Sequence, residues 1–147
     1  MPIHPFLVHF ALSLALLYGG GALFPKLRDT FPPRGQALIE KGALLFLALA
    51  ILSGGNALDS LRARPVTIPP AALLHRLLAL SGATLFVLLW IAGKGGLRLS
   101  PLLRRSIGLA GLLFLLAAAA EGGHLVYDDR LGTEVMPHAS AAPPSAP

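Results

Sequence analysis

The chain has 147 residues, of which 54% are hydrophobic and only 13% are charged, and its mean hydropathy is +0.70. Soluble domains carry about 25% charged residues, so this composition excludes an ordinary water-soluble domain. The absence of cysteine excludes disulfides, thiolate catalysis, covalent c-type haem attachment and cysteine-ligated clusters. The net charge of +5 comes from basic residues that lie between apolar runs, a pattern typical of membrane proteins rather than of nucleic-acid-binding surfaces.

The first apolar run contains no charged residue from Pro5 to Phe24. About 20 apolar residues are enough for one helical crossing of a membrane, so the run predicts a complete span. A secretory signal peptide begins with Lys or Arg, whereas this run follows Met1-Pro2-Ile3-His4. We therefore expect the segment to remain in the mature protein.

Three further apolar runs follow. The second, from Gly42 to Leu58, is short, and the third extends from Ala71 to Gly93 after two prolines, which are tolerated at the start of a helix. The fourth is charge-free from Ser106 to Ala120. The expected spans cover about residues 5–24, 42–58, 71–93 and 104–123.

All four runs are predicted to be helices, because runs of Leu, Ala and Gly lack the alternation of transmembrane strands. Short connections favour antiparallel neighbours. We therefore expect an all-α integral membrane four-helix bundle that forms a single domain over residues 1–136. Residues 137–147 have little to bury and are predicted to form a disordered tail.

The distribution of cations predicts the orientation. Eight basic residues lie in or beside the first and third connections: Lys26, Arg28, Arg34, Lys41, Lys94, Arg98, Arg104 and Arg105. Four lie on the opposite side: Arg62, Arg64, Arg76 and Arg130. The positive-inside rule then predicts a multi-pass protein of the bacterial inner (cytoplasmic) membrane, with both termini on the periplasmic side.

This topology places four histidines at the outer ends of helices: His4, His9, His75 and His124. Histidine is rare at membrane depth, and neutral imidazole binds haem iron, copper and zinc. A haem b between two helices needs one histidine from each helix and small residues where the macrocycle lies. Ala79 and Gly82 follow His75 on one face, Ser13 and Gly20 follow His9, and Ala117 and Ala120 precede His124. The four histidines are therefore the predicted cofactor-binding residues for one or two haems, with His9, His75 and His124 as the leading ligands and His4 as the fourth.

Two other interpretations stay open. A copper or zinc site could use His9, His75, His124 and Glu121, since Glu121 and His124 are three residues apart and share a helix face. Alternatively, the histidines are interfacial polar residues of a non-catalytic membrane subunit or scaffold. Serine-hydrolase, phosphate-binding and dinucleotide motifs are absent from the sequence, so no catalytic residue is predicted.

Three separated motifs carry a resemblance to a known family. They are His4-Pro5-Phe6-Leu7-Val8-His9-Phe10-Ala11-Leu12, Leu74-His75, and Gly122-Gly123-His124-Leu125-Val126-Tyr127 with Leu131-Gly132-Thr133-Glu134-Val135. The chain resembles the small four-span bacterial membrane proteins known as the domain of unknown function 2231 family. The resemblance implies that His4, His9, His75 and His124 are the family's histidines. Many members have His-Gly where this chain has Asp129-Arg130, which puts any site that depends on that position in doubt.

Some members of this family look fused to cytochrome c or Rieske domains, which favours haem and electron transfer. The leading hypothesis is therefore a b-type cytochrome-like membrane protein that exchanges electrons with a periplasmic redox protein or a membrane complex. We expect an electron carrier or subunit rather than a stand-alone enzyme. Membrane lipid is an expected partner, nucleic acid is not, and the bundle is compatible with an oligomer.

Overall fold

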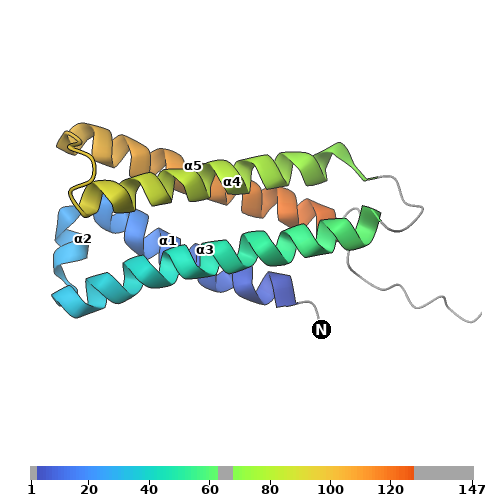
Figure 1. The fold of residues 1–147 in the computed structure, drawn as a ribbon, viewed down its shortest axis with the longest axis horizontal. Coiled ribbons are helices and arrows are strands. Elements are labelled where there is room, and N and C mark those ends of the chain that lie inside the picture. Colours follow the sequence, from blue (N-terminus) through green and yellow to red (C-terminus); the bar gives the residue numbers. More distant parts are fainter. Residues whose placement is uncertain (1–2, 63–67, 128–147) are drawn as a thin grey trace, which may run out of the picture.

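The computed structural model describes residues 3–62 and 68–127, which form five helices. These are α1 (Ile3–Leu23), α2 (Pro25–Asp29), α3 (Pro33–Arg62), α4 (Pro70–Gly93) and α5 (Pro101–Tyr127). The four long helices run antiparallel in one elongated bundle, and the short α2 turns the chain between α1 and α3 (Figure 1). The predicted all-α four-helix bundle is confirmed.

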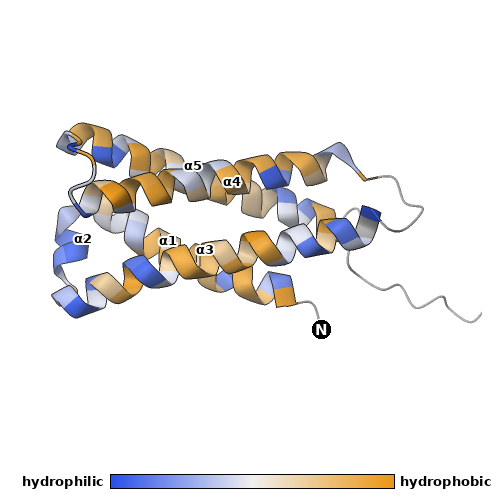
Figure 2. Ribbon diagram, viewed as in Figure 1, coloured by the Kyte–Doolittle hydropathy of each residue, from blue (hydrophilic) through white to orange (hydrophobic). Residues whose placement is uncertain are grey.

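All four long helices are long and apolar enough to cross a membrane, which makes the chain a four-span integral membrane protein. Apolar residues cover the middle of the bundle, and hydrophilic residues gather toward its two ends (Figure 2). Large hydrophobic side chains are exposed on every span, such as Phe6 at 59%, Leu38 at 71%, Leu77 at 63% and Leu102 at 74%. A soluble protein seldom exposes so continuous an apolar surface, whereas lipid tails solvate it.

Proline marks the start of every helix after the first: Pro25, Pro33, Pro70 and Pro101. At the first helical position the missing N–H costs nothing, because the first amides of a helix have no internal partner. The expected second span began at residue 42, but α3 begins at Pro33. A helix can continue beyond the apolar layer, where charged residues such as Glu40 are solvated and do not interrupt it. The sequence prediction therefore located the edge of the apolar run, whereas the helix itself begins at the proline before that run.

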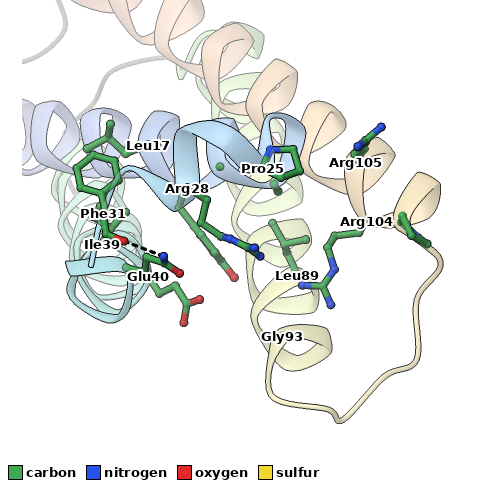
Figure 3. Close-up of a pocket in the computed structure, with 15 residues that line it drawn as sticks. Leu17, Pro25, Arg28, Phe31, Ile39, Glu40, Leu89, Gly93, Arg104 and Arg105 are labelled. Atoms are coloured by element: carbon green, nitrogen blue, oxygen red, sulfur yellow. Dashed lines mark hydrogen bonds between the residues drawn. The ribbon is translucent and has the colours of Figure 1, made fainter. Parts of the chain in front are cut away.

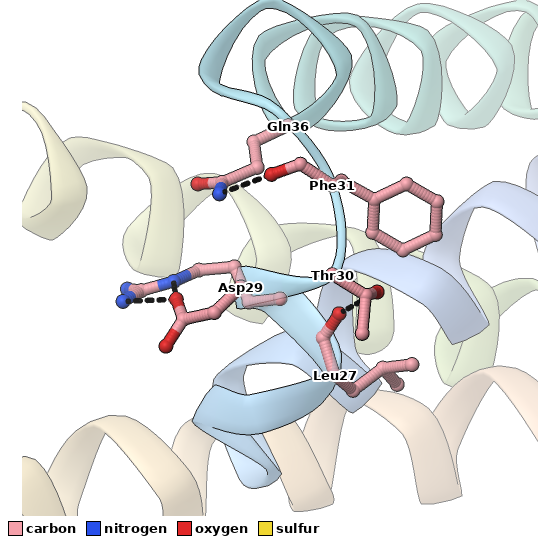
Figure 4. Close-up of polar contacts among 6 residues, drawn as sticks. Leu27, Asp29, Thr30, Phe31 and Gln36 are labelled. Atoms are coloured by element: carbon pink, nitrogen blue, oxygen red, sulfur yellow. Dashed lines mark hydrogen bonds and ion pairs between the residues drawn. The ribbon is translucent and has the colours of Figure 1, made fainter.

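The corner between α1 and α3 contains α2, which the sequence analysis did not predict. The Thr30 hydroxyl donates to the Leu27 carbonyl at 2.6 Å, and the Gln36 side-chain amide donates to the Phe31 carbonyl at 2.9 Å (Figure 4). Asp29 accepts from the neighbouring Arg28 guanidinium at 3.1 Å. These bonds satisfy polar groups where the backbone leaves the helix.

The bundle consists of two helical hairpins. Helix α1 packs mainly against α3, and α4 packs mainly against α5, while α1–α5 and α3–α4 contacts join the two hairpins. Gly82 allows the second hairpin to close tightly, since a Cβ there would lie 2.8 Å from Leu115. Gly19 has the same role between hairpins, because its Cβ would lie 2.8 Å from Leu112. Small residues at such positions let membrane helices approach closely.

Candidate functional site

The end of the bundle opposite α2 gathers the start of α1, the end of α3, the start of α4 and the end of α5 (Figure 1). His4 lies in the first turn of α1 and His75 in the second turn of α4. Glu121 and His124 lie near the end of α5. The antiparallel topology therefore brings these residues to one end of the molecule, as the sequence analysis expected.

His4 and His75 form a pair across the two hairpins. Their ring centres are 6.5 Å apart, and the ring planes are nearly perpendicular at 89°. Two imidazoles on opposite sides of one metal ion, each with a metal–nitrogen bond of about 2.0 Å, have ring centres roughly 6 Å apart. The observed separation is close to that spacing.

Each imidazole is held through its Nδ1 atom. His75 Nδ1 lies 2.7 Å from the Ala118 carbonyl oxygen, which can only accept, so Nδ1 donates. His4 Nδ1 lies 2.8 Å from the Ser53 hydroxyl oxygen, and that hydroxyl donates its own proton to the Ala50 carbonyl at 3.0 Å. Ser53 therefore accepts from His4 Nδ1–H.

In their neutral forms, both imidazoles consequently carry the proton on Nδ1 and a lone pair on Nε2. The hydrogen bonds of His4 to Ser53 and of His75 to Ala118 both run through Nδ1. Metal-binding histidines almost always donate their other ring N–H to a carbonyl, carboxylate or similar acceptor, which fixes the tautomer and the ring orientation. The two Nδ1 contacts are contacts of this kind.

Two glycines accommodate the rings. A Cβ on Gly54 of α3 would lie 2.9 Å from His4 Cε1, and a Cβ on Gly122 of α5 would lie 2.9 Å from His75 Cε1. Real Cβ atoms essentially never come so close to another atom. A side chain on any other residue at position 54 or 122 would therefore overlap with the imidazole.

The other predicted ligands are arranged differently. His9 is exposed, and its Nδ1 lies 2.6 Å from the Pro5 carbonyl in its own helix. Glu121 is half-buried and His124 is exposed on α5. Over residues 3–62 and 68–127, no group of three or more His, Asp or Glu side chains gathers to hold a metal ion. The predicted four-residue metal set therefore does not come together, and His4 with His75 is the pair that does.

Some small residues expected to leave room for a macrocycle serve helix packing instead. A Cβ on Gly82 would meet Leu115, and a Cβ on Gly20 would lie 3.1 Å from Leu27. The side chains of neighbouring helices thus occupy the space beside these glycines. A flat cofactor would have to lie elsewhere along the junction between the hairpins.

Sequence reasoning named both histidines of the pair, although it ranked His9 ahead of His4, and it missed the residues that hold them. Ser53 and Gly54 lie in the apolar part of α3, and Ala118 contributes only its carbonyl. The Ser-Gly-Gly run at 53–55 and the Gly-Gly run at 122–123 were the available signals. Glycine pairs within apolar helices indicate close contacts, although they do not identify the contacting side chain. His138 lies outside the described residues.

Comparison with known proteins adds no relative: no family model matches the chain, and neither a curated protein nor a solved structure matches it. The resemblance to the domain of unknown function 2231 family therefore stays a prediction.

Proposed function

We propose that this four-span membrane protein holds a bis-imidazole metal centre between His4 and His75, that the group is haem b, and that the protein takes part in electron transfer. The observation that carries the proposal is the His4–His75 pair itself, with a ring separation of 6.5 Å and each Nδ1 engaged by a protein acceptor.

The donor set fits haem b, because histidine is a common ligand of haem iron and cofactor sites in bundles are built from side chains on facing helices. The chain would hold the iron through the two Nε2 atoms, while Ser53 and the Ala118 carbonyl fix the orientation of the rings. When bound, haem supplies one-electron chemistry at a potential set by its axial ligands and its burial.

The charge distribution supports an orientation for this centre. Eight cations lie in or beside the connections at the α2 end, and by the positive-inside rule this supports a His4–His75 end at the periplasmic face of a bacterial inner membrane. The proposed electron partner is then a periplasmic redox protein or another membrane complex.

A second candidate is a single copper or zinc ion between the same two imidazoles. The observation that favours it is the packing at Gly82 and Gly20, which places leucine side chains beside both glycines. A single ion needs only the space between the rings, and imidazole suits both metals.

One experiment separates the candidates: oxidised and dithionite-reduced visible spectra, together with metal analysis, of detergent-purified protein expressed with ample haem. A Soret band with sharp reduced α and β bands is the expected result. Colourless protein that contains copper or zinc would favour the single-ion site. Protein with neither pigment nor metal would contradict both and favour a non-catalytic subunit or scaffold.

A further inference from the structure

A second site lies at the other end of the bundle, beside α2. A cleft of about 160 Å³ opens there, lined by residues from all five helices. Tyr18 of α1, Glu40 of α3 and Leu89 of α4 contribute to its walls, together with Arg28 of α2 and Arg104 of α5. None of the histidines takes part, so this cleft is independent of the proposed metal centre.

Positive charge exceeds negative charge in the cleft. Three arginines line it, Arg28, Arg104 and Arg105, against one carboxylate, that of Glu40. Glu40 is already paired with Lys94 at 3.3 Å. Arg28 is also paired, with Asp29 at 3.1 Å in an exposed ion pair. With the partners Lys94 and Asp29 included, four cations face two carboxylates, so the cleft keeps an excess of positive charge.

Two of the arginines extend toward the cleft. The side chains of Arg28 and Arg104 reach into the space beside Leu89, whereas Arg105 points away from it (Figure 3). Arg104 is half-buried and donates from Nη2 to the Ala92 carbonyl at 3.3 Å. A guanidinium has five N–H donors in a fixed fork, so this bond orients Arg104 and leaves further donors for a ligand.

The remaining walls are apolar. Leu17, Ile39, Leu89 and the ring of Phe31 line the cleft together with the charged groups. The residues lie where α1 and α4 end and where α3 and α5 begin, which is the depth of the lipid headgroups for helices that span the bilayer. An apolar wall beside arginines at this depth matches a molecule that has both an acyl chain and an anionic head.

We propose that this cleft binds the phosphate-bearing head of an anionic phospholipid, with Arg28 and Arg104 contacting the phosphate. Arginine binds phosphate oxygens through paired, charge-assisted hydrogen bonds. Basic pockets between membrane helices are a known means of holding anionic headgroups. A cavity of about 150 Å³ admits a molecule the size of benzene, so the cleft accepts the head, while the acyl chains lie along the apolar exterior.

The chain provides its own probe for a test. Trp90 is its only tryptophan and lies next to Leu89 in α4. We would reconstitute the protein in phosphatidylcholine and titrate in brominated phosphatidylglycerol or brominated phosphatidylcholine, whose bromines quench a nearby tryptophan. Arg28→Gln and Arg104→Gln remove the proposed contacts separately, so the test survives if one variant fails to fold. Arg98→Gln is the matched control, because Arg98 is an exposed cation of the α4–α5 connection that does not line the cleft.

The expected result is that the anionic lipid quenches Trp90 at a several-fold lower mole fraction than the zwitterionic lipid. Each arginine variant should reduce this preference about fivefold, and the Arg98 variant should retain it. Equal quenching by both lipids would overturn the proposal. The proposal would also fail if Arg98→Gln reduced the preference for the anionic lipid as much as Arg104→Gln does. If inorganic phosphate bound to the detergent-purified protein while the two lipids quenched equally, the ligand would be a free anion rather than a lipid.

Discussion

At the scale of single residues, the glycines beside the imidazoles set the position of the rings. Gly122 and Gly123 are adjacent in α5, but their surroundings differ. A Cβ on Gly122 would lie within 3 Å of His75, whereas nothing lies within 4 Å of a Cβ on Gly123. The same contrast separates Gly54 from Gly55 in α3.

Gly122→Ala is therefore expected to displace the His75 imidazole and reduce the amount of bound haem or metal. The orienting shell of a metal ligand contributes about 10–100-fold in affinity, and the displaced ring would also lose its bond to Ala118. Cofactor content per mole of purified protein measures the effect. Gly123→Ala is the control, and equal cofactor content in the two variants would show that Gly122 does not position the ring.

Ser53→Ala removes the acceptor of the His4 Nδ1–H group. We expect cofactor affinity to fall about 10–100-fold, with the helix intact, because alanine favours helix more than serine does. Ser60→Ala is the matched control: that hydroxyl also donates to a backbone carbonyl of α3 but does not contact a histidine. A titration of cofactor into the apo variants provides the comparison. Indistinguishable affinities for the two variants would remove Ser53 from the site.

At the scale of helices, sequence reasoning recovered the four spans and their antiparallel order, because apolar length and charge position determine both. It favoured His9 as the ligand from the first span and kept His4 as a fourth, whereas the structure pairs His4 with His75. Five residues at 3.6 per turn separate His4 from His9 by roughly 140° about the helix axis, so only one can face His75. Which histidine faces His75 depends on how α1 packs against α3 and α5. Because apolar residues lie on all sides of α1, its sequence does not indicate which side packs against the other helices.

The packing of α4 against α5 depends on Gly82. A Cβ at this position would lie 2.8 Å from both Cγ and Cδ2 of Leu115, and overpacking a membrane-protein core should cost about 1–3 kcal/mol. We expect Gly82→Ala to lower the free energy of unfolding in detergent, despite the gain of up to about 1 kcal/mol that alanine brings to a helix.

Gly55→Ala serves as the reference for that experiment, because a Cβ at Gly55 meets open space. This variant should be as stable as the parent or slightly more stable. Denaturant titrations followed by helical circular dichroism measure both variants. The account of the α4–α5 contact would be wrong if Gly82→Ala were as stable as Gly55→Ala.

At the scale of the whole molecule, the two ends of the bundle differ in chemistry. One end carries the His4–His75 pair, and the other carries the arginine-lined cleft and the eight cations of the α1–α3 and α4–α5 connections. From this charge difference we proposed above that the arginine end faces the cytoplasm and the histidine end faces the periplasm. The pair would then be accessible to periplasmic partners.

The absence of cysteine makes this orientation measurable without a background signal. Thr30→Cys and Leu97→Cys place single thiols at exposed positions of the α2 end, and Ile3→Cys places one at the histidine end. A membrane-impermeant maleimide added to spheroplasts should label Ile3→Cys and leave the other two unlabelled until the membrane is opened. The reverse pattern would invert the proposed topology and place the histidine pair in the cytoplasm.

The most direct test of the central claim compares three histidine variants, His4→Ala, His75→Ala and His9→Ala, by reduced-minus-oxidised visible spectra and metal content. The account predicts that His4→Ala and His75→Ala each lose cofactor by more than about tenfold, and that His9→Ala keeps the parent spectrum and stoichiometry because its ring is exposed and bonded within its own helix. Retention of cofactor by both His4→Ala and His75→Ala, or a loss in His9→Ala as large as theirs, would contradict it.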